Sequence, residues 1–192
     1  MKNKIYSILF FLTVFISCKD DEANRETEKI KDIKKKEQVF DAINGSWVFN
    51  IPSLQPQTQL LVTNWSEWRL FLTELKQKPK SSIGAFQQKS KALTKKVFDL
   101  NNNIPQRLNQ SAVKSRIAVL ITQIRSLDLY INLQNIPKEK IIVLIPEINL
   151  SIASLEAQFE EIVRKGQIPI EQGETDMIRM LDTSRAIPSI KQ

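Results

Sequence analysis

Apolar side chains recur at steps of three and four residues in four segments between residues 57 and 166. That period places them on one face of an α-helix, so the pattern predicts four amphipathic helices. Their expected ranges are 57–78, 83–104, 108–134 and 137–166. The residues expected to end three of them are Pro79, Pro105 and Gly166. Ser81 or Ser82 is expected to cap the second helix.

Four positions bear on how the apolar faces of these helices, which we call seams, pack together. Trp65 and Trp68 share the apolar stripe of the first helix, which favours core packing over an aromatic platform that binds sugars. Ser90 is the single interruption in the second seam. Pro146 lies inside the last predicted helix and is expected to kink or restart it.

Seams with a seven-residue period and short connections predict an all-α fold, an elongated antiparallel up-down four-helix bundle over residues 57–166. Helices of this size would be roughly 33–42 Å long. The four glycines of the chain are too few for a loop-rich protein and agree with the helical class.

The regions flanking the predicted bundle differ from it in composition. Residues 18–44 contain many charges of both signs, with Ile30 and Ile33 at helical spacing, and predict a charged stalk helix. Residues 45–56 form a connector whose Trp47 and Phe49 are expected to plug one end of the bundle. In the tail, residues 167–192, we expect one short helix that contains Met177, Ile178 and Leu181.

The first residues have the pattern of an export signal. Lys2 and Lys4 are the only charges before residue 19, and a short apolar run follows them. The run is shorter than the ~20 apolar residues that a membrane-spanning helix needs, and four charged residues come directly after Cys18. We therefore predict that residues 1–17 are a signal peptide.

The sequence Phe15-Ile16-Ser17-Cys18 resembles the lipobox that the lipoprotein signal peptidase recognises, with Phe15 in place of the usual leucine. The resemblance implies that Cys18 becomes lipidated, through a diacylglycerol thioether and usually an N-linked acyl chain such as palmitate. A lipid bilayer would then be a partner of the protein, because two or more acyl chains hold a protein stably in a membrane.

Lys19-Asp20-Asp21 resembles the leader that directs lipoproteins of Bacteroidota-type bacteria to the cell surface. In this leader the chain is similar to small uncharacterised lipoproteins of those bacteria. The resemblance implies a lipid-anchored protein of the cell envelope, in the outer membrane and at the cell surface. A solvated spacer beside the bilayer is an equally good interpretation of these three residues.

Composition excludes several kinds of chemistry. The chain has no histidine and one cysteine, so imidazole-based triads, Glu-x-x-His di-iron sites and disulfides within the chain are all excluded. We expect no catalytic residues, no metal and no cofactor. Glu156, Glu160 and Glu161 are the nearest thing to a carboxylate site, and we interpret them as a solvated face in which Arg164 pairs with Glu160.

Charge is uneven along the chain, whose formal net charge is +7. Within residues 75–127, eleven basic residues face a single acid, Asp99. The candidate anion-binding surface consists of Lys89, Lys91, Lys95, Lys96, Lys114 and Arg116. The interpretation we favour is that these residues solubilise two helix faces and pair with the acidic segment 128–182.

These observations predict a non-catalytic binding or structural module attached to the cell envelope. The alternative is a protein that binds an anionic envelope polymer through its basic helical surface. An envelope protein or an anionic glycan is the expected partner, and nucleic acid is not expected for an exported protein.

Overall fold

The computed structural model describes residues 19–169, and all regular secondary structure within them is helical. The all-α prediction is therefore confirmed for this range. In chain order the elements are α2 (Lys19–Ser46), α3 (Pro56–Thr63), α4 (Ser66–Lys76), α5 (Ile83–Asp99), the 3-10 helix η1 (Gln106–Leu108), α6 (Ser111–Ile131) and α7 (Lys138–Lys165). The predicted signal peptide and the short helix expected around Met177, Ile178 and Leu181 lie outside the described residues.

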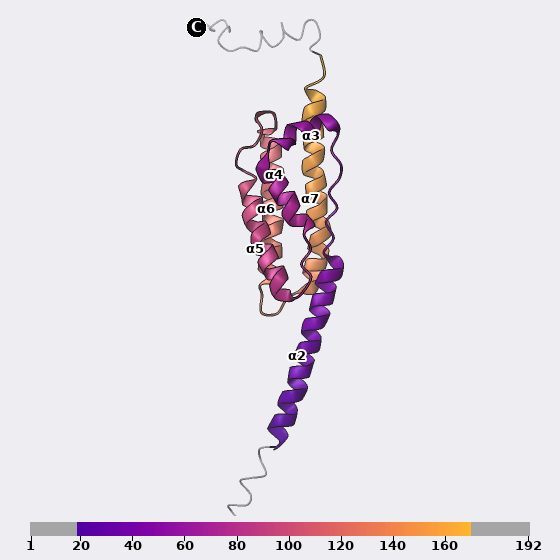
Figure 1. The fold of residues 1–192 in the computed structure, drawn as a ribbon, viewed down its shortest axis with the longest axis vertical. Helices are drawn as coiled ribbons and strands as arrows, with labels where there is room; N and C mark the ends of the chain where they lie inside the picture. Colours follow the sequence, from indigo (N-terminus) through magenta and orange to yellow (C-terminus); the bar gives the residue numbers. More distant parts are fainter. Residues whose placement is uncertain (1–18, 170–192) are drawn as a thin grey trace, which may run out of the picture.

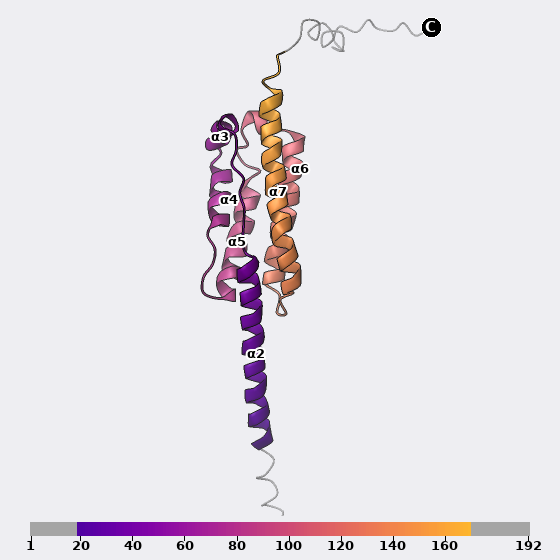
Figure 2. The ribbon, with the colours of Figure 1, turned by 90° about the vertical axis from the view of Figure 1, so that its right-hand side faces the viewer.

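The long helices lie side by side, and the chain passes up and down among them (Figure 1). α6 packs against both α5 and α7, and α4 packs against α5. α3 lies across the end of this group where α7 finishes, whereas α2 leaves from the opposite end (Figures 1 and 2). The largest side chains buried between the helices are Trp65, Trp68, Phe71, Phe86 and Phe159.

The segment predicted as one helix over residues 57–78 is two helices, so that prediction is wrong. α3 ends at Thr63, and Trp65 has an extended backbone (φ −87°, ψ 91°) as the residue before α4. This break turns the indole of Trp65 into the core, where its Nε1 donates a hydrogen bond to the carbonyl of Asn102 over 3.1 Å. Trp65 and Trp68 are at most 1% exposed and stack with ring centroids 5.9 Å apart, so their predicted place in the core is confirmed.

α5 begins as predicted and ends early. The hydroxyl of Ser82 accepts a hydrogen bond from the backbone N–H of Ala85 over 3.2 Å, so Ser82 is the cap. The helix stops at Asp99, five residues before the predicted end at residue 104. Asn103 has a positive φ of 53°, a conformation that asparagine tolerates better than most residues, and it belongs to the turn that leads into η1.

The polar interruption in the α5 seam is matched on α6. Ser90 is fully buried, and its Oγ donates to Oδ1 of Asp128 over 2.6 Å. Nδ2 of Asn132 donates to the same carboxylate oxygen over 2.8 Å. The buried hydroxyl of Ser90 is therefore hydrogen-bonded, and this bond between α5 and α6 favours one alignment of the two helices along their length.

α7 continues through Pro146, so the expected restart does not occur. Proline removes one backbone hydrogen bond, to the carbonyl four residues earlier, which belongs to Ile142. Pro146 and Ile142 are both on the exposed side of the helix, where water can solvate that carbonyl. Gly166 is the C-cap of α7, as predicted.

The connector closes the end of the helical group from which α2 leaves. Trp47 is 2% exposed and meets the ring of Phe86, at the start of α5, edge to face with centroids 5.0 Å apart. Phe49 packs on Trp47 in the same way at 5.4 Å. Asn149 of α7 holds the next residues of the connector, because its side chain accepts from the N–H of Asn50 and donates to the carbonyl of Val48. The expected plug is confirmed.

Candidate functional site

The residues with the most specific sequence pattern lie outside the described range. These are Phe15, Ile16 and Ser17 of the predicted peptidase recognition site, together with Cys18, the predicted lipidation site. The backbone of Lys19, Asp20 and Asp21 forms the first turn of α2. Cys18 is therefore the residue that directly precedes a helix of 28 residues.

Much of α2 is exposed to solvent. Every residue from 24 to 38 is exposed, and Ile30 and Ile33 are 63% and 57% exposed. Burial begins at Val39 and Phe40 and is complete at Ile43, where α2 packs on α7. Figure 2 shows the helix projecting lengthwise from the helical group. The first part of α2 thus has the exposure expected of a stalk.

Two of the six basic residues in the candidate anion-binding surface are engaged with neighbouring helices. Nζ of Lys89 pairs with Oε1 of Glu74 on α4 over 2.5 Å. Nε of Arg116 donates to Oγ of Ser154 on α7 over 3.2 Å. Lys89 and Arg116 therefore face different helix interfaces and do not belong to one common surface.

The other four are freer. Lys91, Lys95 and Lys114 are exposed and Lys96 is half-buried. In the range 19–169 none of these four makes an ion pair. Lys95 and Lys96 lie near the end of α5, and Lys114 lies near the start of α6, which follows it in the chain. What remains of the candidate surface is this group, which we call the α5–α6 basic group.

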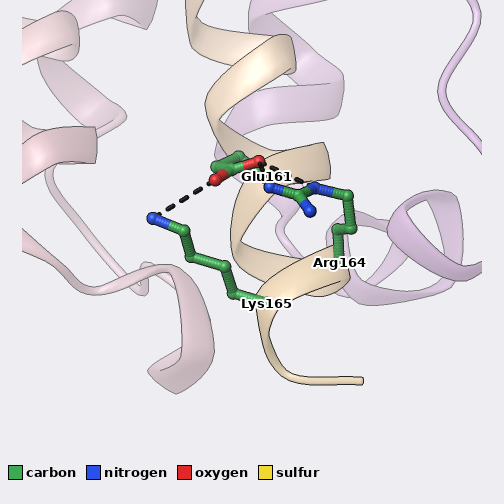
Figure 3. Close-up of polar contacts among 3 residues, drawn as sticks. All are labelled: Glu161, Arg164 and Lys165. Carbon is green, nitrogen blue, oxygen red and sulfur yellow. Dashed lines mark hydrogen bonds and ion pairs between the residues drawn. The ribbon is translucent and has the colours of Figure 1, made fainter. Parts of the chain in front are cut away.

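Within residues 128–169, the described part of the acidic segment, no carboxylate forms an ion pair with a basic residue of α5 or α6. Two of the three ion pairs between described residues join Glu161 to Arg164 and Lys165 of its own helix, over 2.7 and 3.2 Å. Figure 3 shows both cations reaching back to the one carboxylate. Their hydrogen bonds, Arg164 first, lower the pKa of Glu161. Arg164 therefore pairs with Glu161. The sequence predicts a pair with Glu160, and that prediction is wrong.

Glu160 has a structural contact of its own. Its Oε1 accepts from the backbone N–H of Gln55 over 2.6 Å, and its Oε2 accepts from the hydroxyl of Thr58 over 2.8 Å. Gln55 is the N-cap residue of α3, and its own side chain makes no capping bond. A carboxylate of α7 thus binds a free donor at the start of another helix and holds α3 against α7.

Glu156 is buried, which contradicts its predicted place on a solvated face. It is 3% exposed, and its Oε2 has no hydrogen-bond partner among the described residues. The pKa of Glu156 is raised to about 7, first by burial and then by the charge of Glu160, while Lys76 opposes both. The spacing held a clue to this position, since residue 156 follows Ile152 by four and precedes Phe159 by three, both core positions.

The described residues offer little further chemistry. They contain no group of three acidic, cysteine or histidine side chains that could hold a metal ion. A groove of 630 Å³ runs beside Glu160, Glu161 and Thr58. The polar groups of these three residues already make the hydrogen bonds and ion pairs described above. A second groove of 680 Å³ lies between the stalk and the α6–α7 loop, where Nζ of Lys35 donates to Oδ1 of Asn135 over 3.3 Å.

α7 is long and apolar enough to cross a membrane if judged by length and composition alone, and it is the one such helix in the range 19–169. In the structure, 39% of its most apolar stretch is buried inside the protein, and it packs along α6. A core helix of a folded domain passes the same test, so the composition of α7 does not by itself indicate a membrane span.

The chain matches no protein-family model, no curated protein and no solved structure.

Proposed function

We propose that this protein is a membrane-anchored lipoprotein of the bacterial cell envelope and serves as a non-catalytic binding or structural module. The observation that supports this most is the Phe15-Ile16-Ser17-Cys18 pattern immediately before α2. An acyl-anchored cysteine followed by a solvent-exposed helix is an arrangement suited to holding a folded domain away from a bilayer.

In this proposal the domain is an elongated antiparallel up-down four-helix bundle on a helical stalk, with α3 and α4 together serving as its first helix. The pairwise packing of α4 on α5, α5 on α6 and α6 on α7 supports it. The 28 residues of α2 correspond to a rod of about 42 Å at 1.5 Å per residue, and its residues 24–38 are exposed.

Substitution of Cys18 tests the anchor. In cells fed a palmitate analogue that can be labelled, the protein is expected to be labelled and to sediment with membranes. Cys18→Ser is expected to abolish the label and release the domain from membranes. Ser17→Ala keeps a small residue before the cysteine and is the matched control, with labelling unchanged. Labelling that survives Cys18→Ser would refute the proposal.

We propose further that the protein lies in the outer membrane and faces the cell surface, with Lys19, Asp20 and Asp21 as the export signal. Replacing all three with Ala is expected to protect the domain from protease added to intact cells, while palmitate labelling stays unchanged. If the replaced protein is digested as before, these residues serve as a solvated spacer only.

The α5–α6 basic group supports a second candidate function, binding of an anionic envelope polymer. Lys91, Lys95 and Lys114 are exposed and free of ion pairs with described residues. Binding to lipopolysaccharide should then be strong at low salt and weak at high salt. Replacing these three residues with Glu should abolish it. The same change at Lys29, Lys31 and Lys34 of the stalk is the matched control. If both triple variants lose the same amount of lipopolysaccharide binding, the binding depends on net charge and not on the α5–α6 basic group.

A further inference from the structure

One aromatic ring is exposed near the end of α5. Phe98 is 45% exposed, whereas every other aromatic side chain in the range 19–169 is buried or half-buried. The guanidinium carbon of Arg125, on the neighbouring helix α6, lies over this ring at 5.8 Å from its centroid. The ring of Phe98 therefore lies at the surface with a cation beside it and does not fill the core.

Arg125 is held by this contact but has no ion-pair partner among the described residues. It is exposed, and it takes part in none of the ion pairs of the range 19–169. A cation over an aromatic ring is attracted through the ring face, which restricts the arginine and leaves its N–H donors available. Paired N–H groups of a guanidinium match the two oxygens of a carboxylate. Arg125 is thus suited to receive a carboxylate from outside the protein.

Arg125 also lines a groove of 450 Å³ between α5 and α6. Four residues of α6 that line it are spaced i, i+3, i+4, i+7, namely Thr122, Arg125, Ser126 and Leu129, and Thr94 lines it from α5. The hydroxyls of Thr122 and Ser126 each donate to a carbonyl one turn earlier over 2.9 Å. A hydroxyl that donates in this way keeps oxygen lone pairs that can accept a further hydrogen bond. The groove therefore offers hydrogen-bond acceptors to the hydroxyl groups of a ligand.

Positive charge predominates around the groove. Lys91 and Lys95 are exposed and lie on the same side of α5 as Phe98, because successive spacings of four and three residues share one side of a helix. Among the residues that line the groove, Asp128 alone has a carboxylate, and its Oδ1 already accepts two hydrogen bonds. The two lysines and Arg125 therefore make the charge of this surface complementary to an anion.

The lining suits an acidic sugar better than a partner helix or a phosphate group. Leu129 is the only apolar residue among those that line the groove, so an apolar helix would cover polar groups without bonding them. Phosphate sites often use the backbone N–H groups of a helix N-terminus, but the lining residues lie beyond the first turns of α5 and α6. A sugar has hydroxyl groups for the polar wall and an apolar C–H face for the ring of Phe98.

We propose that the α5–α6 groove binds a carboxylate-bearing sugar unit of an acidic polysaccharide. Arg125 receives the carboxylate, the ring of Phe98 packs against the apolar face of the sugar, and Lys91 and Lys95 attract the neighbouring acidic units. This inference rests on the second candidate function, binding of an anionic envelope polymer, and adds the class of sugar and the residues that recognise it.

A trisaccharide of galacturonic acid is the probe, titrated calorimetrically into the full chain at about 0.15 M salt. The wild-type protein is expected to bind it, and to bind the uncharged trisaccharide of galactose about tenfold or more weakly. Phe98→Ala and Arg125→Lys are each expected to raise the Kd about tenfold or more, although the second keeps the positive charge. If either variant binds as the wild type does, or the wild type does not bind, the proposal is overturned.

Leu70→Ala is the matched control for Phe98→Ala. Leu70 is 50% exposed on α4, and both removed side chains are about half exposed, so both variants should remain folded. The Kd of Leu70→Ala is expected to equal that of the wild type, and an equal loss from both variants would contradict the role of Phe98. Inorganic phosphate that displaces the trisaccharide at equal concentration would identify a phosphate site and overturn the proposal.

The outcomes separate this site from the broader function. If replacing Lys91, Lys95 and Lys114 with Glu abolishes lipopolysaccharide binding while Arg125→Lys leaves the Kd for the trisaccharide unchanged, the sugar site is refuted and the second candidate function stands. If trisaccharide binding requires Phe98 and Arg125 while the lysine variant still binds lipopolysaccharide, the second candidate function fails and the groove stands.

Discussion

The carboxyl group of Glu156 is enclosed by the helices with one oxygen lacking a partner among the described residues. An unpaired charge there is unfavourable, and the neutral acid avoids most of that penalty. Glu160, one turn away, is instead held by two donors from α3 and its N-cap. Two carboxylates on one helix therefore differ in their effect on the free energy of unfolding.

Glu156 should make the stability depend on pH. Its pKa is about 7 in the folded protein against 4.5 for an unperturbed side chain. The proton is thus bound more tightly in the folded state, and the stability present below pH 4.5 is lost as the pH rises through 7. Glu156→Gln should raise the free energy of unfolding by about 1–3 kcal/mol at pH 8 and change it little at pH 4. Urea unfolding at the two pH values measures both.

Glu161→Gln is the matched control for that experiment. Glu161 lies on the same helix, but its pKa is lowered by Arg164 and Lys165, so its contribution has the opposite sign. Its loss should not raise stability at pH 8. If Glu156→Gln behaves like Glu161→Gln, the carboxyl of Glu156 is hydrated and the core is more open there than the structure indicates.

At the scale of elements, the local sequence explains where some helices begin and tertiary contacts explain where others end. The seams of α5, α6 and α7 were predictable because seven-residue periods leave one helical register for the apolar side chains. The break before Trp65 was not, because the hydrogen bond from its indole to Asn102 joins residues 37 positions apart. The burial of Glu156 was not predicted, because a charged side chain is usually exposed and its spacing from the core residues Ile152 and Phe159 was given less weight.

The cap of α5 allows a direct comparison between neighbouring serines. Ser82→Ala removes the bond to the N–H of Ala85 and should lower the free energy of unfolding by about 1 kcal/mol. Ser81→Ala lies one residue outside the cap and should change it by less than about 0.5 kcal/mol. Denaturant unfolding of both variants checks the assignment, and equal effects would contradict it.

The interior proline of α7 provides a second prediction. Pro146→Ala restores the backbone bond to Ile142 on an exposed side and should stabilise the protein by about 1–3 kcal/mol, read as a higher Tm. Pro137→Ala, at the N-cap of the same helix, restores no interior bond and should have a much smaller effect. A lower Tm for Pro146→Ala would show that the proline is needed for packing.

At the scale of the whole molecule, a folded domain and a helix that projects from it are joined in one chain (Figure 1). Residues 24–38 are exposed throughout, so local propensity and surface contacts such as that of Lys35 with Asn135, with little burial, maintain that part of α2. Their amides should exchange with deuterium much faster than those of α6, which is buried along one face. Protection of the stalk equal to that of α6 would indicate a coiled-coil partner there.

The role proposed for α2 depends on the leader, because an exposed helix serves as a spacer only if its first residue is attached to a membrane. The resemblance to a lipobox rests on four residues, Phe15-Ile16-Ser17-Cys18. The position of Cys18 just before α2 agrees with the resemblance without testing it. Neither the helical period nor the packing of the domain contains information about acylation, which is a covalent event at the end of the chain.

Intact and peptide mass spectrometry of the mature protein, purified from its own membranes, tests the anchor most directly. The account predicts an N-terminal peptide that begins at Cys18 and has the added mass of a diacylglyceryl group, with or without an N-linked acyl chain. An unmodified Cys18, or a mature N-terminus at any other residue, would contradict it.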